Sequence, residues 1–411
     1  MPRDLLMQRR FVALVRSDPS GVRAGFVALL VSAVASLVAG LTLGSITGTL
    51  EELPGLLVLV PAAIGMRGNI FGALGSRLGT AIHTGTFGGA RRRDTPVGQS
   101  LAAAMLLSIS VSLLLAVVAK IVAVGFGLTN TISVADFAVI SVVGGVLSSI
   151  VVLLITLGVA TLSVRQDWDF DNVASPIVTT SGDMVTLPSL FLATFLVQLH
   201  IVTPIVAVLC AIVGVIALVE GIRSPQPILR RVVRESVPVL LVAAIIDVIA
   251  GITVEKRLDT LVATPALLVL IPPFLAQSGS LGGILACRIS TKLHLGLVSP
   301  NRVTLRPVAE DVMLIALYAL PVYLLVGLSS DLVAALVGLK SPGVLEILAV
   351  ALIAGAITAT LLVVVAYGAA VGAYRLGLDP DNYAIPIVTS GLDLLGAVTL
   401  ILVIVGLGLG D

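Results

Sequence analysis

Charged residues are scarce in this chain of 411 residues: Asp, Glu, Lys and Arg make up 11% of it, whereas hydrophobic residues make up 58%. The mean hydropathy of +1.16 leaves too little polar surface to cover a water-soluble globule. The net charge is only +1, and no basic domain is present, so we expect no nucleic-acid partner. This composition indicates an integral membrane protein.

Cysteine and histidine are also rare, which limits catalytic and metal-binding chemistry. Cys210 and Cys287 lie in apolar runs without the spacing of metal ligands, and we interpret both as small hydrophobic residues. The three histidines, His83, His200 and His294, lie at expected helix ends and form no cluster with a nucleophile. We therefore expect that the protein is not an enzyme.

Apolar runs of about 20 residues follow one another along the chain, the length that an α-helix needs to cross the hydrocarbon core of a bilayer. The runs are continuous rather than alternating, which favours helices over the strands of a β-barrel. The expected fold class is therefore an all-α integral membrane protein. Dividing the runs at charged residues, Pro and Gly predicts eleven spans, near 24–45, 54–82, 98–126, 134–163, 175–197, 200–220, 234–254, 264–294, 308–329, 343–374 and 384–408.

One stretch of the chain occurs twice. Residues 169–183, DFDNVASPIVTTSGD, return 210 residues later as 379–393, DPDNYAIPIVTSGLD, and nine of the fifteen positions are identical. Earlier in each copy, Pro61 matches Pro272 and His83 matches His294, both 211 residues apart. We predict a lead at 1–23, a first five-helix repeat at 24–197, a linker with an extra transmembrane helix at 198–233, and a second five-helix repeat at 234–411.

The extra helix near 200–220 decides the relative direction of the two repeats. Because five helices per repeat is an odd number, directly joined repeats would point in opposite directions, and one additional crossing makes them parallel. The loops that would then be cytoplasmic hold most of the arginines, as the positive-inside rule requires. We expect a pseudo-twofold axis along the membrane normal, with the N-terminus cytoplasmic and the C-terminus outside the cell membrane.

Each copy of the repeated stretch ends on an aspartate, Asp183 or Asp393, inside an apolar helix. A carboxylate near the centre of a bilayer costs about 2.5–3.5 kcal/mol on insertion scales, so its presence in both copies points to a function. Thr179 and Thr389 lie one turn earlier on the same helix face. Oxygen ligands without His or Cys suit a hard cation such as Mg²⁺ or Ca²⁺. Bonding of each Asp to neighbouring Ser or Thr side chains is the structural alternative.

The second helix of each repeat carries a row of small residues on one face, which lets another backbone come close. The polar residues Arg67, Asn69 and Gln277 lie on these two helices at a depth where contact with lipid is costly. Close helix packing and the lining of a path through the membrane both account for this pattern.

The two motifs resemble those of the MgtE magnesium transporters. The second-helix pattern runs from Pro61 through Gly65, Gly68 and Asn69 to Gly72, and the fifth helix carries Pro, Thr, Thr or Ser, and Asp. The duplication in one chain is most similar to the two-repeat solute-carrier relatives of MgtE.

The resemblance implies transport of Mg²⁺, or of another divalent cation, through a central path between two MgtE-like repeats in a lipid bilayer. It implies that Asp183 and Asp393 hold a largely hydrated ion, that the carbonyls of Thr179 and Thr389 assist, and that Asn69 contributes from the second helix. Because one chain supplies both halves of the path, a monomer that is a pseudo-dimer is expected.

Further acids leave a second possibility open, a Mg²⁺ exchanger coupled to Na⁺ or H⁺. Asp247 lies inside the first helix of the second repeat, where the first repeat has Ser36. Asp136 and Glu346 lie near expected helix starts and are further candidates for a coupling site. Hydrogen bonding between helices accounts for Asp247 equally well.

Overall fold

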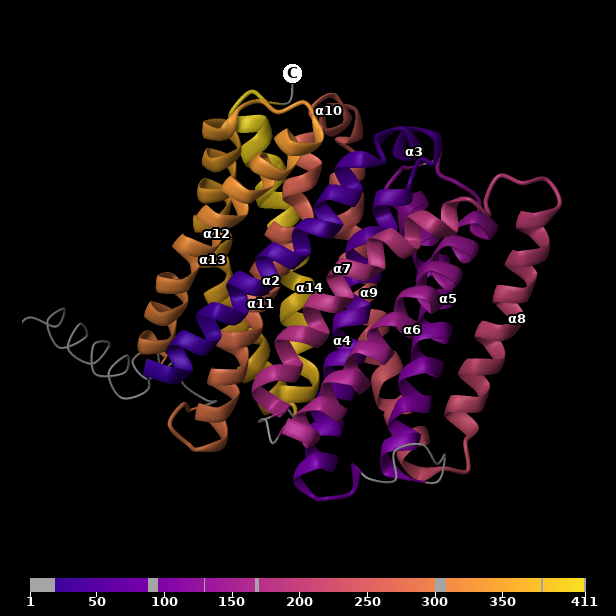
Figure 1. The fold of residues 1–411 in the computed structure, drawn as a ribbon, viewed down its shortest axis with the longest axis vertical. Coiled ribbons are helices and arrows are strands. Elements are labelled where there is room, and N and C mark those ends of the chain that lie inside the picture. The colour runs from indigo at the N-terminus through magenta and orange to yellow at the C-terminus, as the bar shows by residue number, and fades with distance from the viewer. Residues whose placement is uncertain are drawn as a thin grey trace, which may run out of the picture. The chain divides into compact units, whose positions relative to one another are not determined.

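In the computed structural model the described part of the chain, residues 19–87, 95–128, 130–166, 170–299, 308–377 and 380–409, is helical and contains no strand (Figure 1). Eleven of its helices have 22 residues or more. They are α2 (Pro19–Ser45), α4 (Leu56–His83), α5 (Pro96–Gly125), α6 (Val134–Gln166), α7 (Phe170–Thr194), α8 (Val202–Arg223), α9 (Pro227–Glu255), α11 (Pro265–His294), α12 (Ala309–Val337), α13 (Val344–Arg375) and α14 (Pro380–Gly406).

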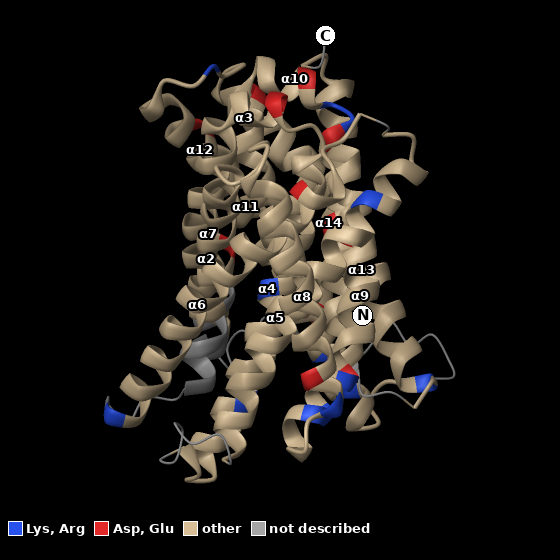
Figure 2. Ribbon diagram, turned by 90° about the vertical axis from the view of Figure 1, so that its right-hand side faces the viewer, with Lys and Arg blue, Asp and Glu red and all other residues tan. Residues whose placement is uncertain are grey.

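The eleven predicted spans are thus confirmed as long helices, and the expected all-α class is confirmed with them. Ten of the helices are long and apolar enough, over their described residues, to cross a membrane. The remaining one, α7, has 25 residues. Figure 2 shows that Lys, Arg, Asp and Glu lie mainly toward the helix ends and leave the helix middles nearly free of charge, as a multi-pass membrane protein requires.

The helices form two compact units, and these units do not coincide with the two sequence repeats. One unit runs from Val38 to Val262, and the other combines the chain up to Leu37 with the chain from Ala263 onward. Helix α9, the predicted first helix of the second repeat, therefore belongs to the unit that holds α4 to α8, while most of α2 belongs to the unit that holds α11 to α14. Each unit thus contains the predicted first helix of the other repeat.

In the unit of residues 38–262, α4 is the central helix and packs against α5, α7 and α9. A Cβ atom built on Gly251 of α9 would lie 2.6 Å from the carbonyl oxygen of Val58 and 2.7 Å from that of Leu57. The two backbones are therefore in direct contact, which only a glycine permits. Glu255 at the end of α9 accepts a hydrogen bond of 2.6 Å from the backbone N–H of Gly55, the residue before α4, and is 9% exposed.

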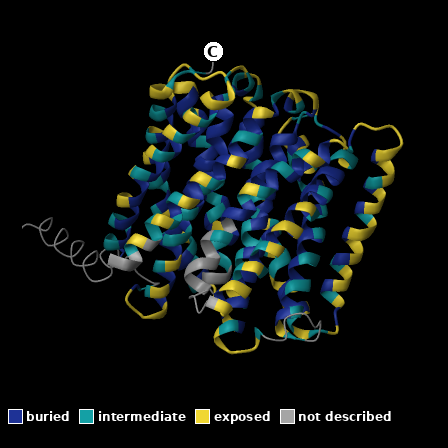
Figure 3. Cartoon of the chain, viewed as in Figure 1, coloured by how far each residue is buried: buried dark blue, intermediate teal, exposed yellow. Residues whose placement is uncertain are grey.

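The extra helix, α8, lies at the edge of this unit beside α5 and α6. Only 28% of its most apolar segment is buried in the protein, compared with 67% for the corresponding segment of α4. Figure 3 shows exposed residues along the length of α8. Its exposed residues are mostly Val, Leu and Ile, so this face suits contact with lipid. Two short helices, α3 (Thr47–Glu52) and α10 (Leu258–Ala263), were not predicted, because neither has an apolar run.

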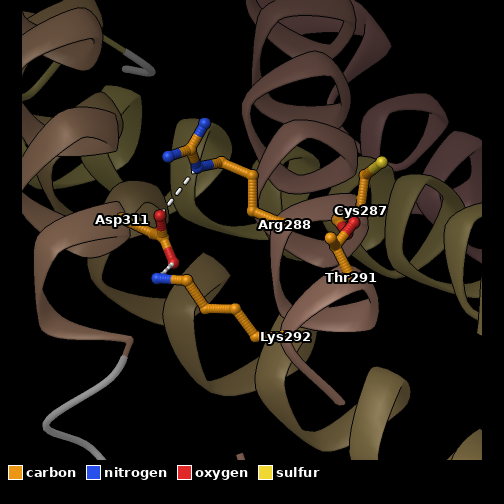
Figure 4. A network of polar contacts seen from close by, with 5 residues as sticks. All are labelled: Cys287, Arg288, Thr291, Lys292 and Asp311. Atoms are coloured by element: carbon orange, nitrogen blue, oxygen red, sulfur yellow. Dashed lines mark hydrogen bonds and ion pairs between the residues drawn. The ribbon is translucent and has the colours of Figure 1, made fainter. Parts of the chain in front are cut away.

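In the other unit, α11 packs against α12, α13 and α14, and 78% of the most apolar segment of α11 is buried in the protein. The part of α2 that belongs to this unit, up to Leu37, is held by the hydroxyl of Tyr318, which donates a 2.8 Å hydrogen bond to the carbonyl oxygen of Val22. Near the end of α11, Asp311 of α12 is fully buried and pairs with Arg288 at 2.7 Å and with Lys292 at 2.5 Å (Figure 4). This buried carboxylate joins α11 to α12, and its two cations offset the cost of burying it.

Substitution of Gly251 by Ala should lower the free energy of unfolding by about 1–3 kcal/mol, because the added methyl group meets backbone oxygens that cannot rotate away. Thermal denaturation of the protein in detergent measures this change. Gly158→Ala in α6 is the matched control, since a Cβ there would meet nothing within 4 Å. Equal melting temperatures for the two variants would contradict the backbone contact between α9 and α4.

Candidate functional site

The two motif aspartates occupy equivalent places in the two units. Asp183 lies on α7 and Asp393 on α14, and both side chains are partly buried. Helix α14 continues without a break through Pro386, and the hydroxyl of Thr389 donates a 3.0 Å hydrogen bond to the carbonyl oxygen of Pro386. The side chain of Thr179 lies outside the described residues.

In the first of these places, α7 packs closely against α4. A Cβ atom built on Gly182 would lie 3.6 Å from the Cβ of Arg67 and 3.7 Å from the backbone nitrogen of Gly68. Gly182 of α7 therefore packs against α4 at Arg67 and Gly68. The predicted close approach through the small residues of the second helix is not found at Gly68 or Gly75, where an added Cβ would meet nothing within 4 Å.

The corresponding helices of the second repeat, α11 and α14, also pack against each other, through different residues. A Cβ atom built on Gly279 would lie 3.8 Å from the Cβ of Thr389 and 3.9 Å from Oδ1 of Asp393. Gly279 follows Gly68 by 211 residues, and Asp393 follows Asp183 by 210. In the second repeat, then, the carboxylate of Asp393 lies against a glycine of the second helix, whereas in the first repeat Gly182, the residue before Asp183, makes the contact with α4.

The two contacts differ in which helix carries the large side chain. In the first repeat Phe71 of α4 is fully buried and the matching turn of α7 has Gly182. In the second repeat the positions are reversed: Gly282 stands on α11, and a Cβ there would overlap the buried side chain of Leu392 on α14. At these corresponding positions the large side chain thus stands on α4 in the first repeat and on α14 in the second.

Two polar atoms near the first contact have no hydrogen-bond partner among the described residues. They are Nδ2 of Asn69, which is partly buried, and Oγ1 of Thr180, which is 7% exposed. Unsatisfied polar atoms inside a protein mark places where water or a polar ligand binds. Asn69 and Thr180 therefore suit a hydrated substrate near Asp183.

Arg67 and Gln277, which the sequence also allows as lining residues, are fully buried and bond to neighbouring helices. Arg67 donates from Nε to Ser148 at 3.1 Å and from Nη2 to Ser112 at 2.9 Å. Gln277 bonds to Ser32 of α2 at 3.3 Å. Their observed contacts are thus those of helix packing.

The further acids lie in different surroundings. Asp247 is 1% exposed on α9, within the unit that also holds Asp183, and its counterpart Ser36 donates to a carbonyl of its own helix. Asp136 accepts from the backbone N–H and the hydroxyl of Ser133 at 3.1 and 2.7 Å, which is a helix cap at the start of α6. Glu346, 210 residues later, lies exposed in the first turn of α13.

No group of three or more His, Cys, Asp or Glu side chains that could hold a bare metal ion occurs in the part of the chain that the structure describes. Carboxylates that stand outside such a group, together with unsatisfied amide and hydroxyl groups, suit a hydrated cation, because Mg²⁺ usually keeps several of its waters. The role of Glu255 as a cap of α4 was not predicted from the sequence. Glu255 directly precedes Lys256 and Arg257, so it was interpreted as part of a polar loop.

Comparison with known proteins identifies a family model and several relatives that match this chain. The family model MgtE, described as a divalent cation transporter, matches residues 60–193 and 271–403, one match in each repeat. Solute carrier family 41 member 2 of Macaca fascicularis is 28% identical over 379 residues, which are 84% of this chain and 63% of the relative. Member 3 of Rattus norvegicus is 27% identical over 281 residues, 65% of this chain and 59% of the relative.

Member 3 of the same family from Mus musculus is 26% identical over 378 residues, 84% of this chain and 74% of the relative. The chain therefore spans about three fifths of the length of the first two relatives. No solved structure matches the chain.

Substitution of Gly282 by Ala should destabilise the protein by about 1–3 kcal/mol, because the new Cβ overlaps Leu392. Leu392→Ala alone should also destabilise it, by leaving a cavity. The double variant should lose less stability than the sum of the two single variants, since each change relieves the other. Melting temperatures in detergent that are simply additive would show that these residues are not in contact.

Proposed function

Because the chain belongs to the MgtE family of divalent cation transporters, we propose that it moves Mg²⁺ across the cell membrane as a hydrated ion held by Asp183 and Asp393. Oxygen atoms of Thr179, Thr389 and Asn69 contact the water molecules that surround the ion. The two repeats at 24–197 and 234–411 each supply one carboxylate, so a single chain acts as a pseudo-dimer. The proposed orientation has the N-terminus in the cytoplasm and the C-terminus outside.

The observation that carries this proposal is the recurrence of an aspartate in both repeats, on a fifth helix that packs against the second helix. Asp393 lies against Gly279 of α11, and Gly182, the residue before Asp183, lies against Arg67 and Gly68 of α4. Placing a carboxylate at this depth is costly in each repeat, and a bound divalent cation offsets that cost in both. The oxygen-only chemistry suits a hard cation.

Replacement of both aspartates by Asn should lower Mg²⁺ flux into proteoliposomes at least tenfold, because the amides keep the shape of the site and remove its charge. Flux is followed with a Mg²⁺-sensitive dye trapped inside the vesicles. Asp136→Asn is the matched control: it also removes one carboxylate from a helix, but that carboxylate caps α6. Wild-type flux in the Asp183→Asn, Asp393→Asn variant, with the protein folded, would exclude the proposed site.

A second candidate function, exchange of Mg²⁺ for Na⁺ or H⁺, is favoured by the burial of Asp247. This acid is 1% exposed on helix α9, which packs against α4, and Ser36 stands at the corresponding position of the first repeat. A buried acid that occurs in only one repeat suits a site for a coupling ion.

If the protein is an exchanger, an inward Na⁺ or H⁺ gradient should change Mg²⁺ flux, and Asp247→Asn should abolish this response while leaving Mg²⁺ binding intact. Asp259→Asn, a change of an exposed acid on α10, is the control. Flux that ignores both gradients would identify a channel or uniporter instead.

A further inference from the structure

A groove of about 270 Å³ opens at the start of α9, in the unit of residues 38–262. Its lining residues all belong to the first turns of this helix, and they are Pro227, Arg230, Arg231, Arg234 and Glu235. We call it the basic groove, because its three arginines and one glutamate leave it with a net charge of +2. A groove with this charge suits an anionic group.

The charges of the basic groove are only partly matched by the protein. Nε of Arg231 pairs with Oε1 of Glu235 at 2.9 Å, one helical turn away. Nε of Arg234 donates a 3.1 Å hydrogen bond to the carbonyl oxygen of Ile222 in the last turn of α8. Arg230 is exposed and forms no ion pair with another described residue. Arg230 and Arg234 therefore keep N–H groups that can bind an anion.

The start of α9 is fixed to two neighbouring helices, so the basic groove has a defined shape. The backbone N–H of Ile228 donates a 3.1 Å hydrogen bond to Oε1 of Gln99 on α5. A Cβ atom built on Gly221 of α8 would lie 2.9 Å from Cγ1 of Val233, which shows that α8 and α9 are in direct contact there. Arginines on a fixed backbone lose less freedom when they bind a ligand.

The basic groove lies where the chain turns at the surface of the membrane. Helices α8 (Val202–Arg223) and α9 (Pro227–Glu255) are both long and apolar enough to cross a bilayer. Only residues 224–226 connect them, and a connection this short keeps the end of α8 and the start of α9 close to the membrane surface. The phosphates of lipid headgroups lie at this level.

Beyond the arginines, the same face of α9 becomes apolar. Pro238, Val242 and Ile245 follow Arg234 at spacings of four, four and three residues, which place them on one helix face. All three are exposed, Val242 by 50% and Ile245 by 37%. We call them the apolar stripe. An acyl chain can lie along this stripe while its headgroup lies in the basic groove, whereas a free phosphate ion would gain nothing from the stripe.

We propose that the basic groove binds the phosphate group of an anionic phospholipid, with an acyl chain along the apolar stripe. Basic pockets at the ends of transmembrane helices recognise such headgroups through charge and hydrogen bonds. In the orientation proposed above, this lipid belongs to the cytoplasmic leaflet, where anionic lipids are found. The lipid site does not depend on which ion the protein transports. A lipid bound there stabilises the start of α9, the helix that packs against α4.

Thermal denaturation of the full chain in a neutral detergent, with lipid added, tests the proposal. Phosphatidylglycerol should raise the melting temperature by about 3 °C or more, and phosphatidylcholine with the same acyl chains should raise it by less than half as much. The variant Arg230→Gln, Arg231→Gln should lose most of the phosphatidylglycerol effect. Equal effects of the two lipids on the wild type, or an undiminished effect in the variant, would overturn the proposal.

The matched control is the variant Lys256→Gln, Arg257→Gln, which removes two exposed cations at the opposite end of α9. It should keep the wild-type response, and a loss as large as that of the groove variant would mean that the lipid responds to overall charge. If the groove variant does not fold, the wild type is measured in about 1 M NaCl, which screens exposed charges strongly. An undiminished phosphatidylglycerol effect at that salt concentration would also overturn the proposal.

A soluble anion distinguishes a lipid site from a site for free phosphate. Glycerol phosphate carries the anionic group of phosphatidylglycerol without acyl chains, and at equal concentration it should give less than a third of the lipid's effect on the melting temperature. An equal effect of glycerol phosphate would show that the basic groove takes a soluble anion and would contradict the role of the apolar stripe.

Discussion

The close contact between the second and fifth helix of each repeat is the constraint on which the candidate site depends. Inside a membrane a carboxylate is tolerated only where protein or a bound ion surrounds it, so Asp183 and Asp393 must be held against other helices rather than against lipid. Gly279 of α11 lies in van der Waals contact with Thr389 and Asp393 of α14, and Gly182 of α7 lies against Arg67 and Gly68 of α4. Gly282 of α11 faces Leu392 of α14, whereas Phe71 and Gly182 stand at the corresponding positions of the first repeat, so the two contacts differ in their residues.

The exchange of first helices between the compact units adds a second constraint. Helix α9 packs against α4 through Gly251, and its last residue, Glu255, accepts a hydrogen bond from the start of α4. The first part of α2 is held in the other unit by Tyr318 and Gln277. With the repeats as predicted, α4 and α11 are each supported by the first helix of the other repeat.

Hydropathy and internal repetition were sufficient to predict the helices and the motif positions. The spans expected near 200–220 and 264–294 are found at Val202–Arg223 and Pro265–His294, since apolar runs with charged or Pro boundaries determine both. The start of α9 was predicted at 234 and is found at Pro227, because the arginines of its first turns are polar in composition yet helical in structure. The short helices α3 and α10 left no apolar signal.

The packing partners could not be predicted, because a hydrophobic pattern shows which face is buried but not which helix covers it. For this reason, an alignment of the two repeats does not show that α2 and α9 each pack in the unit that holds the other helices of the opposite repeat. Arg67 looked like a lining residue because its polarity was the only information in the sequence; its serine partners lie 45 and 81 residues away.

The measurement that tests the central claim most directly is the position of a bound divalent cation. Mn²⁺ substitutes for Mg²⁺ at oxygen sites and scatters anomalously, so a crystal structure with Mn²⁺ locates the ion without reference to transport. We predict an anomalous peak beside the carboxylates of Asp393 and Asp183, with water between metal and protein. A peak that lies only elsewhere in the membrane-spanning part, away from both aspartates, would contradict the account.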